Sequence, residues 1–444
     1  MKNSILFLKL FLLFSLLGWA QEQPKKTFWE KLDPSLVVAT ETSYEFDSGK
    51  LQKSEWIIKP EFTYKFNRRS KLVFRGQIYS EFQDNLEADI PNQQTVTGYN
   101  KRLFLDRHTN LELRELYYYT RLNGLNLTLG KQQIVWGETD GLKLLDVVNP
   151  QNFREFILDD FEDSRIPLWS IKAEFDVKDI GVQLLWIPDN TYHITQDFNA
   201  PYFTRSLFPT PPEGVSAQLN KPKKPNRFFA DSDFGVKLTT FTKGWDVSLN
   251  YLYYYDDLPA FYSQLEIVDN NPVVSIDPEY ERQQLLGGTF NKVFGSSTFR
   301  GELAYVLGQH FISDNLNATR GVETSDFFRT ALGIDFIKGE YVLSGQIFNE
   351  WVMETISPFN RERWETNYSL LASRELLNDS LKAEVLWVHS SNHGDGYITP
   401  SLSYWVNTNT QLLLNAHLFY GKETQLFGQF KDRSRISIGF KWGI

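Results

Sequence analysis

The chain has 444 residues, a formal net charge of −9 and no cysteine. We expect no nucleic-acid partner for so acidic a chain, and a chain without cysteine makes no disulfide and carries no thiol chemistry. No run of about 18 apolar residues follows the N-terminal stretch, so transmembrane helices are excluded there.

The first 20 residues have the features of a secretory signal peptide. Lys2 precedes an apolar stretch that ends at Ala20, a small residue that suits signal cleavage. We expect residues 1–20 to be removed. Residues 21–35 then form a short periplasmic leader, and residues 36–444 form a single outer-membrane domain.

Residues 54–83 contain two long stretches in which apolar and polar residues alternate. The apolar side of the first stretch is Trp56, Ile58, Pro60, Phe62, Tyr64 and Phe66. Each stretch is about 13 residues long, whereas globular strands peak at about 5 to 6 residues and a strand that crosses a bilayer needs about 9 to 11. The pattern therefore predicts a hairpin whose strands span a membrane, with one face toward lipid and one toward water.

Short and long connections alternate along the rest of the chain. The short ones lie at 67–70, 123–124, 176–179, 242–244, 293–296, 338–339, 378–379 and 407–410. The long ones lie at 84–108, 137–168, 188–231, 256–280, 308–325, 352–362, 390–396 and 421–433. Tight periplasmic turns and long outside loops are typical of outer-membrane barrels.

The segments between these connections predict an all-β fold, a transmembrane antiparallel β-barrel of 16 to 18 strands, with 18 the best estimate. Aromatic residues make up 15 % of the chain and are spread along it, as interfacial girdles require. A sandwich of two long-stranded sheets is the alternative, and the signal peptide and loop asymmetry favour the barrel.

The chain end at Ser437, Gly439, Trp442 and Ile444 is similar to the C-terminal signal that outer-membrane assembly machinery reads, although Ile444 stands where an aromatic residue is usual. An ordinary last strand is the alternative. We therefore expect the protein to reside in the cell outer membrane of a Gram-negative bacterium, with outer-membrane lipids and the assembly machinery as partners.

The most specific motif begins near the end of the strand that precedes the 137–168 connection. Gly130-Lys131-Gln132 leads to Trp136-Gly137-Glu138, and Asp146-Val147-Val148-Asn149-Pro150 follows in the loop. A Trp-Gly-Glu sequence followed by Asp-x-x-Asn-Pro resembles the porin-like outer-membrane proteins of the alginate-export type. The resemblance implies an 18-stranded barrel and passive passage of a solute, without naming the solute.

The loop from 137 to 167 is expected to contain a short helix. Asn149 suits a helix cap and Pro150 the first helical position, and Phe153, Phe156, Ile157 and Phe161 then recur at helical spacing. Folded into the lumen, this loop narrows the channel; the alternative is that it only anchors itself against the wall. The proline-rich loop from 188 to 232 is the other segment that could fill the lumen.

Charges of both signs lie on the inferred inner face: Lys59, Glu61, Arg75, Lys172, Glu174, Arg300, Glu302, Arg329, Asp335, Lys382 and Glu384. A lining with charges of both signs suits hydrophilic solutes in general better than it suits ions of a single sign. The candidates for the solute path and its constriction are Trp136, Glu138, Asp146, Asn149, Arg165, Arg75, Arg300 and Arg329. No metal site and no cofactor is expected.

The function predicted on these grounds is a porin-like channel, not an enzyme, for a hydrophilic or amphiphilic solute that the sequence does not identify. His389-Ser390-Ser391-Asn392 resembles the His-x-Ser-Asn of outer-membrane phospholipases, so lipid hydrolysis by His389 and Ser391 is one alternative. The next strand offers no carboxylate or amide to orient the histidine. A plugged barrel with a structural or assembly role is the other alternative.

Overall fold

The computed structural model describes residues 27–28, 31–87, 89–139, 141–197, 200–207, 215–313, 315 and 317–444. The expected signal peptide, residues 21–26 of the expected leader and residues 208–214 of the proline-rich loop lie outside the described residues.

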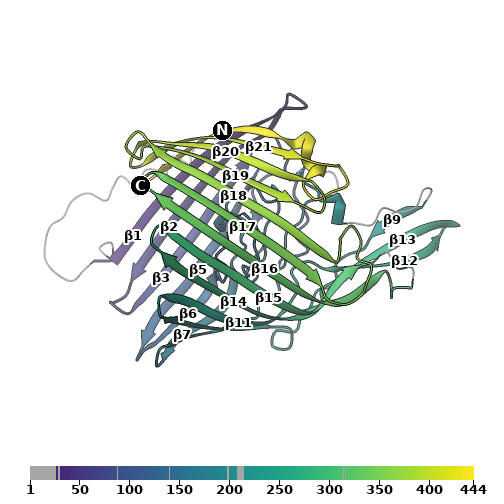
Figure 1. Cartoon of the computed structure of the whole chain (residues 1–444), viewed down its shortest axis with the longest axis horizontal. Coiled ribbons are helices and arrows are strands. Elements are labelled where there is room, and N and C mark those ends of the chain that lie inside the picture. Colours follow the sequence, from purple (N-terminus) through teal and green to yellow (C-terminus); the bar gives the residue numbers. More distant parts are fainter. Residues whose placement is uncertain are drawn as a thin grey trace.

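The described chain forms one closed antiparallel β-barrel of 18 strands, as expected (Figure 1). Each strand pairs with the next, and β1 pairs with β22 to close the ring. The ring consists of β1 (Leu32–Glu45), β2 (Leu51–Lys65), β3 (Ser70–Glu81), β5 (Thr109–Leu122), β6 (Leu125–Gln132), β7 (Leu168–Val177), β8 (Ile180–Ile187), β10 (Asp233–Thr242), β11 (Trp245–Tyr255), β14 (Arg282–Phe294), β15 (Ser297–Ile312), β16 (Val322–Lys338), β17 (Tyr341–Val352), β18 (Trp364–Leu376), β19 (Leu381–Ser390), β20 (Gly396–Asn407), β21 (Thr410–Tyr420) and β22 (Arg435–Gly443).

All eight predicted short connections are tight turns at one end of the barrel, and the long loops lie at the other end. The turn between β5 and β6 shows why. Asn123 and Gly124 both have positive φ angles, 46° and 93°, as a two-residue turn that follows the twist of the strands requires.

Three features differ from the prediction. Strand β1 begins at Leu32 rather than near Leu36, and a two-residue strand, β4 (Leu103–Phe104), pairs with β5 inside a predicted loop. The predicted loops 188–231 and 256–280 contain β9 (Ser216–Leu219), β12 (Ala260–Val268) and β13 (Asn271–Glu279), which form a separate three-stranded sheet beyond the barrel (Figure 1). The turn between β12 and β13 has positive φ at Asp269 and Asn270, so a hairpin signal was present there.

The barrel is apolar outside and polar inside. On β11, Leu249 is 52 % exposed and the next residue, Asn250, is fully buried. Such a surface suits a bilayer, because lipid meets the apolar side chains and the closed ring leaves no backbone edge unpaired. None of the helices in the described part of the chain is long and apolar enough to cross a membrane.

The closing seam includes the last residue of the chain. The backbones of Leu36 and Ile444 exchange two hydrogen bonds of 3.0 Å beyond the paired part of β1 and β22. On the inner side of the same seam, the hydroxyls of Ser43 and Ser437 lie 2.7 Å apart.

Candidate functional site

The loop between β6 and β7, which carries the predicted motif, begins with a tryptophan anchored in the wall. Trp136 is 1 % exposed, and its indole nitrogen donates to Gln183 on β8 over 2.8 Å. Gly235 on β10 makes room for the ring, because a Cβ there would lie 2.9 Å from it. Trp136 is therefore an anchor of the loop.

The close approach of two parts of the loop explains why the middle residue of the Trp-Gly-Glu motif is a glycine. A Cβ on Gly137 would lie 2.8 Å from the backbone nitrogen of Asp146, so only glycine lets these two parts of the loop approach so closely. Asn149 joins the two ends of the loop, since its side chain accepts from the Ile134 nitrogen (2.7 Å) and donates to the Ile166 carbonyl (2.9 Å).

The predicted helix at 150–161 is wrong. Asn149 uses its side chain for the two bonds just described, and Phe156 has a φ of 58°, which a helix does not allow. The one helix in this loop is the short α2 (Phe161–Ser164). The aromatic residues that suggested a longer helix have separate partners: Phe153 packs edge-to-face with His193, Phe156 packs with Phe430, and the Lys143 ammonium lies over the Phe161 ring.

On one side, the loop is held by β14, β15 and β16. Glu302 accepts from the backbone nitrogen of Leu145 over 3.0 Å and from that of Glu138. Arg300 donates to the Glu138 carbonyl (2.6 Å) and pairs with Asp335 (3.0 Å). Further bonds run from Asn291 to the Glu138 carboxylate (3.0 Å) and from Arg329 to the Lys143 carbonyl (3.3 Å).

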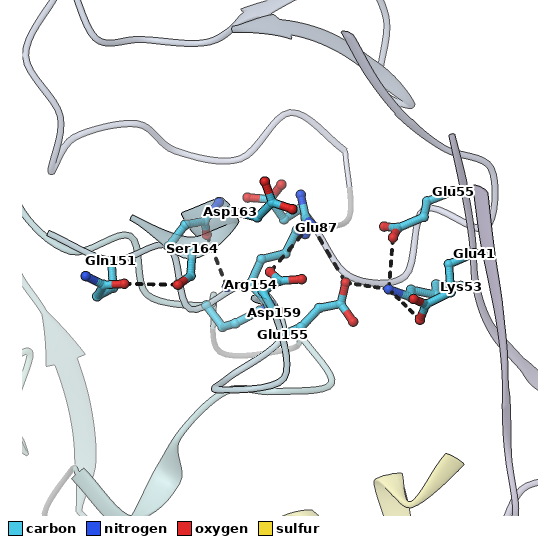
Figure 2. Close-up of polar contacts among 12 residues, drawn as sticks. Glu41, Lys53, Glu55, Glu87, Gln151, Arg154, Glu155, Asp159, Asp163 and Ser164 are labelled. Carbon is cyan, nitrogen blue, oxygen red and sulfur yellow. Dashed lines mark hydrogen bonds and ion pairs between the residues drawn. The ribbon is translucent and has the colours of Figure 1, made fainter. Parts of the chain in front are cut away.

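On the opposite side, the loop is held by a buried charge cluster at the closing seam. Glu155 accepts from Lys53 on β2 over 2.8 Å (Figure 2). It also accepts from Arg435 on β22. Glu41 and Glu55 also lie about Lys53, at 3.1 and 3.0 Å. Burial alone would raise the pKa of Glu155, but the neighbouring cations Lys53, Arg435 and Arg154 hold it well below its ordinary value, so Glu155 is ionised.

Apolar packing fills the space around these polar contacts. Phe156 of the loop packs with Phe430, with ring centroids 4.7 Å apart, and belongs to a buried cluster built from four loops and three wall strands. The members of this cluster are Leu86, Phe156, Tyr202, Val388, Tyr397, Phe419, Phe427 and Phe430. Tyr202 comes from the proline-rich loop. Both loops that were predicted to enter the lumen therefore contribute residues to this buried cluster.

An ion pair stands between two cavities. The Arg165 guanidinium contacts the Asp146 carboxylate at 2.7 Å. Asp146 lines a cavity of about 340 Å³ near the long loops, and Arg165 lines one of about 590 Å³ toward the short turns. We refer to them as the outer cavity and the inner cavity.

The predicted arginines lie around these cavities. Arg75 lines the inner cavity and contacts Glu115 at 3.1 Å and Glu61 at 3.4 Å. Arg329 lines the outer cavity and contacts Glu350 at 2.8 Å. The eight predicted residues are thus gathered on and around one loop, and their part in solute passage stays a prediction.

Sequence reasoning missed Glu155, Lys53 and Arg435. Lys53 lies just outside the predicted stretch 54–83, although it belongs to β2 and its side chain points inward. Glu155 was hidden by the predicted helix. The missed signal is the two-residue period, which puts Arg435 and Ser437 on the same inward face of β22.

The histidine and serine of the alternative hydrolase motif contact different partners. β19 ends at Ser390, so Ser391 lies in a turn and not on the strand face of His389 as predicted. The Ser391 hydroxyl donates to the Thr366 carbonyl (3.0 Å), and Nδ1 of His389 lies 3.0 Å from the Tyr420 hydroxyl. These contacts do not form a nucleophile with its base.

A family model described as "Protein of unknown function (DUF1302)" matches residues 42–442. No curated protein sequence matches the chain.

Several solved structures are similar. OccAB2 of Acinetobacter baumannii is 9 % identical with a TM-score of 0.54, over 95 % of this chain and 99 % of that one. OccK1 (OpdK) of Pseudomonas aeruginosa is 12 % identical with a TM-score of 0.52, over 94 % of this chain and 100 % of that one. A structure of OpdK with vanillate aligns equally well. At these identities the comparison shows the fold alone: the chain has the closed 18-stranded β-barrel fold of these outer-membrane porins.

Proposed function

The chain belongs to the family described as "Protein of unknown function (DUF1302)". From its fold and its lumen, we propose that the protein is a channel for a small hydrophilic or amphiphilic solute, narrowed by the 137–167 loop. The observation that carries this proposal is the Asp146–Arg165 pair between the outer and inner cavities. A barrel of about 18 strands leaves an aqueous channel unless something fills it, and this loop contacts opposite walls.

The lining supports a selective path rather than an open one. The outer cavity combines apolar side chains with ionised ones, whereas the inner cavity is mainly polar. A solute that crosses both meets fixed charges at close range, where a low dielectric constant strengthens their effect. The OpdK structure with vanillate gives one example of a small organic solute in a barrel of this fold.

The likeness to alginate-export proteins remains part of this proposal. Trp136, Gly137, Asp146 and Asn149 of the motif each fix the loop, which gives a physical reason for this set of residues.

The test is reconstitution of the purified protein in a planar bilayer, with current recorded while sugars, amino acids and small aromatic ions are added. Discrete conductance steps that one solute class blocks would support the proposal. A barrel that inserts, shows heat-modifiable mobility on a gel and carries no current would contradict it and favour the plugged, structural role.

A further inference from the structure

The outer cavity has an apolar body and a polar rim. Its apolar lining includes Phe153, Ile157, Phe161, Leu285, Val306 and Phe327. Three of these are aromatic rings, which bind both apolar groups and cations. A cavity of about 340 Å³ suits a small organic molecule.

The two cations of the cavity already have partners. The Lys143 ammonium bonds to Gln151, lies 3.7 Å from Asp146 and sits 4.3 Å from the centre of the Phe161 ring. Arg329 donates to Glu350 and to the Lys143 carbonyl. An anionic solute would have to displace these contacts.

The carboxylates of the cavity are not balanced in the same way. Asp256 accepts from Gln283 (2.9 Å), Gln309 (2.8 Å) and a backbone nitrogen, all uncharged donors. Within the described part of the chain, the Asp257 carboxylate has no hydrogen-bond donor, and its nearest basic group is Nδ1 of His193 at 4.0 Å. The two neighbouring carboxylates therefore lack a cation.

His193 does not supply that cation. Its Nδ1 accepts a hydrogen bond from the Gln151 backbone nitrogen over 2.8 Å, so the ring proton is on Nε2. Burial and the nearby Lys143 lower the pKa of His193 to about 3, which keeps the ring neutral at physiological pH. Burial and the neighbouring acids Asp256 and Asp233 raise the pKa of Asp257, which favours its neutral form while no cation lies beside it. A cation placed beside Asp257 would lower that pKa and favour the carboxylate.

A second, independent feature is Asp146 at the floor of the cavity. Its side chain is 5 % exposed, and Arg165 holds only Oδ2. Its Oδ1 is buried and has no hydrogen-bond donor within the described residues. Buried carboxylate oxygens normally have a donor, so the unpaired Oδ1 leaves the Asp146 carboxylate only partly satisfied beside this cavity.

We propose that the outer cavity binds a small amphiphilic organic cation, an amine with an aromatic or branched apolar body, whose ammonium group contacts Asp257. The aromatic rings hold the apolar body, and the incompletely satisfied Asp146 carboxylate adds negative charge beside it. This inference rests on the proposed channel and names the class of solute that its outer part selects.

The test is calorimetric titration of the purified full-length protein in detergent with three probes of similar size. These are phenethylammonium, neutral 2-phenylethanol and anionic 3-phenylpropanoate. Phenethylammonium should bind at least about tenfold more tightly than 2-phenylethanol, because its ammonium group donates a charge-assisted hydrogen bond that the neutral hydroxyl cannot donate. Anion binding equal to or tighter than cation binding would overturn the proposal.

Variants locate the site. Asp257→Asn should weaken phenethylammonium binding at least about tenfold and leave 2-phenylethanol binding unchanged. Asp246→Asn is the matched control, since Asp246 lies at the short-turn end of β11 and does not line the cavity. Ile157→Trp, which fills the cavity, should weaken both ligands. Unchanged cation binding in Asp257→Asn, or in Ile157→Trp if the first variant does not fold, would overturn the proposal.

Binding in detergent does not require current, so the two proposals fail separately. A protein that binds phenethylammonium and carries no current keeps this site and loses the channel. A protein that conducts without binding it keeps the channel and loses this site.

Discussion

Replacing Glu155 with glutamine is the most informative single change. In the structure, Glu155 joins the loop to Lys53 on β2 and to Arg435 on β22, and both members of the Lys53 pair are almost fully buried, at 3 % and 1 % side-chain exposure. The substitution keeps the shape of the side chain and removes its charge. It should therefore weaken the attachment of the loop to the closing seam without changing the strands.

The contacts that Lys53 and Arg435 keep after the substitution set the size of the effect on loop attachment. Breaking a buried ion pair costs about 3 to 5 kcal/mol. Lys53 still contacts Glu41 and Glu55, and Arg435 still bonds to Gln52 (2.6 Å), so we expect the lower end of that range. About 3 kcal/mol corresponds to roughly a hundredfold increase in the population of barrels with a detached loop.

Single-channel recording measures that population as the fraction of time spent at full conductance. Glu155→Gln should raise this fraction roughly a hundredfold relative to the parent. Glu162→Gln is the control in the same loop: its side chain is 73 % exposed and lies 3.6 Å from Arg75, and exposed pairs contribute about 0 to 1 kcal/mol. An open fraction in Glu155→Gln that equals that of Glu162→Gln, in a correctly inserted barrel, would refute the reasoning.

Three further predictions concern charge and assembly. Arg165→Ala removes the closer of the two cations beside Asp146 and leaves only Lys143 at 3.7 Å, so the reversal potential in a salt gradient should shift toward cation selectivity. Burial and the neighbouring Glu155 raise the pKa of Asp159 to about 7. Ionisation of Asp159 adds a negative charge to the outer cavity, so cation selectivity should rise as the pH passes about 7. Asp159→Asn should remove this pH dependence. Deleting Trp442–Ile444 removes the last part of the β22 pairing with β1 and should reduce outer-membrane insertion more than total synthesis, measured by fractionation and heat-modifiable mobility.

The strands could be predicted because each one lies between two different environments. Leu249 faces outward and Asn250 inward, and this alternation is written directly in the sequence. The tight turns were equally local, as Asn123-Gly124 shows. The β12–β13 hairpin was missed because Pro272 and Pro278 argue against a strand, although both fit the small sheet outside the barrel.

The interior of the lumen could be predicted only in part. The Trp136 to Asn149 motif pointed to a loop that contacts opposite walls of the barrel. The helical spacing of Phe153, Phe156 and Phe161 was misleading, because each ring packs with a different partner inside the barrel. The contact between Lys53 and Glu155 joins positions 102 residues apart, and no local pattern indicates it.

The most direct test of the central claim is the conductance of a protein that lacks residues 151–163, compared with the parent. Trimming the β12–β13 hairpin, which lies beyond the barrel, is the matched control and should leave conductance unchanged. If the loop narrows the channel, the deletion protein should insert normally, conduct more than the parent and lose its preference among solutes. A deletion protein that inserts normally, conducts like the parent and keeps the same solute preference would contradict the account.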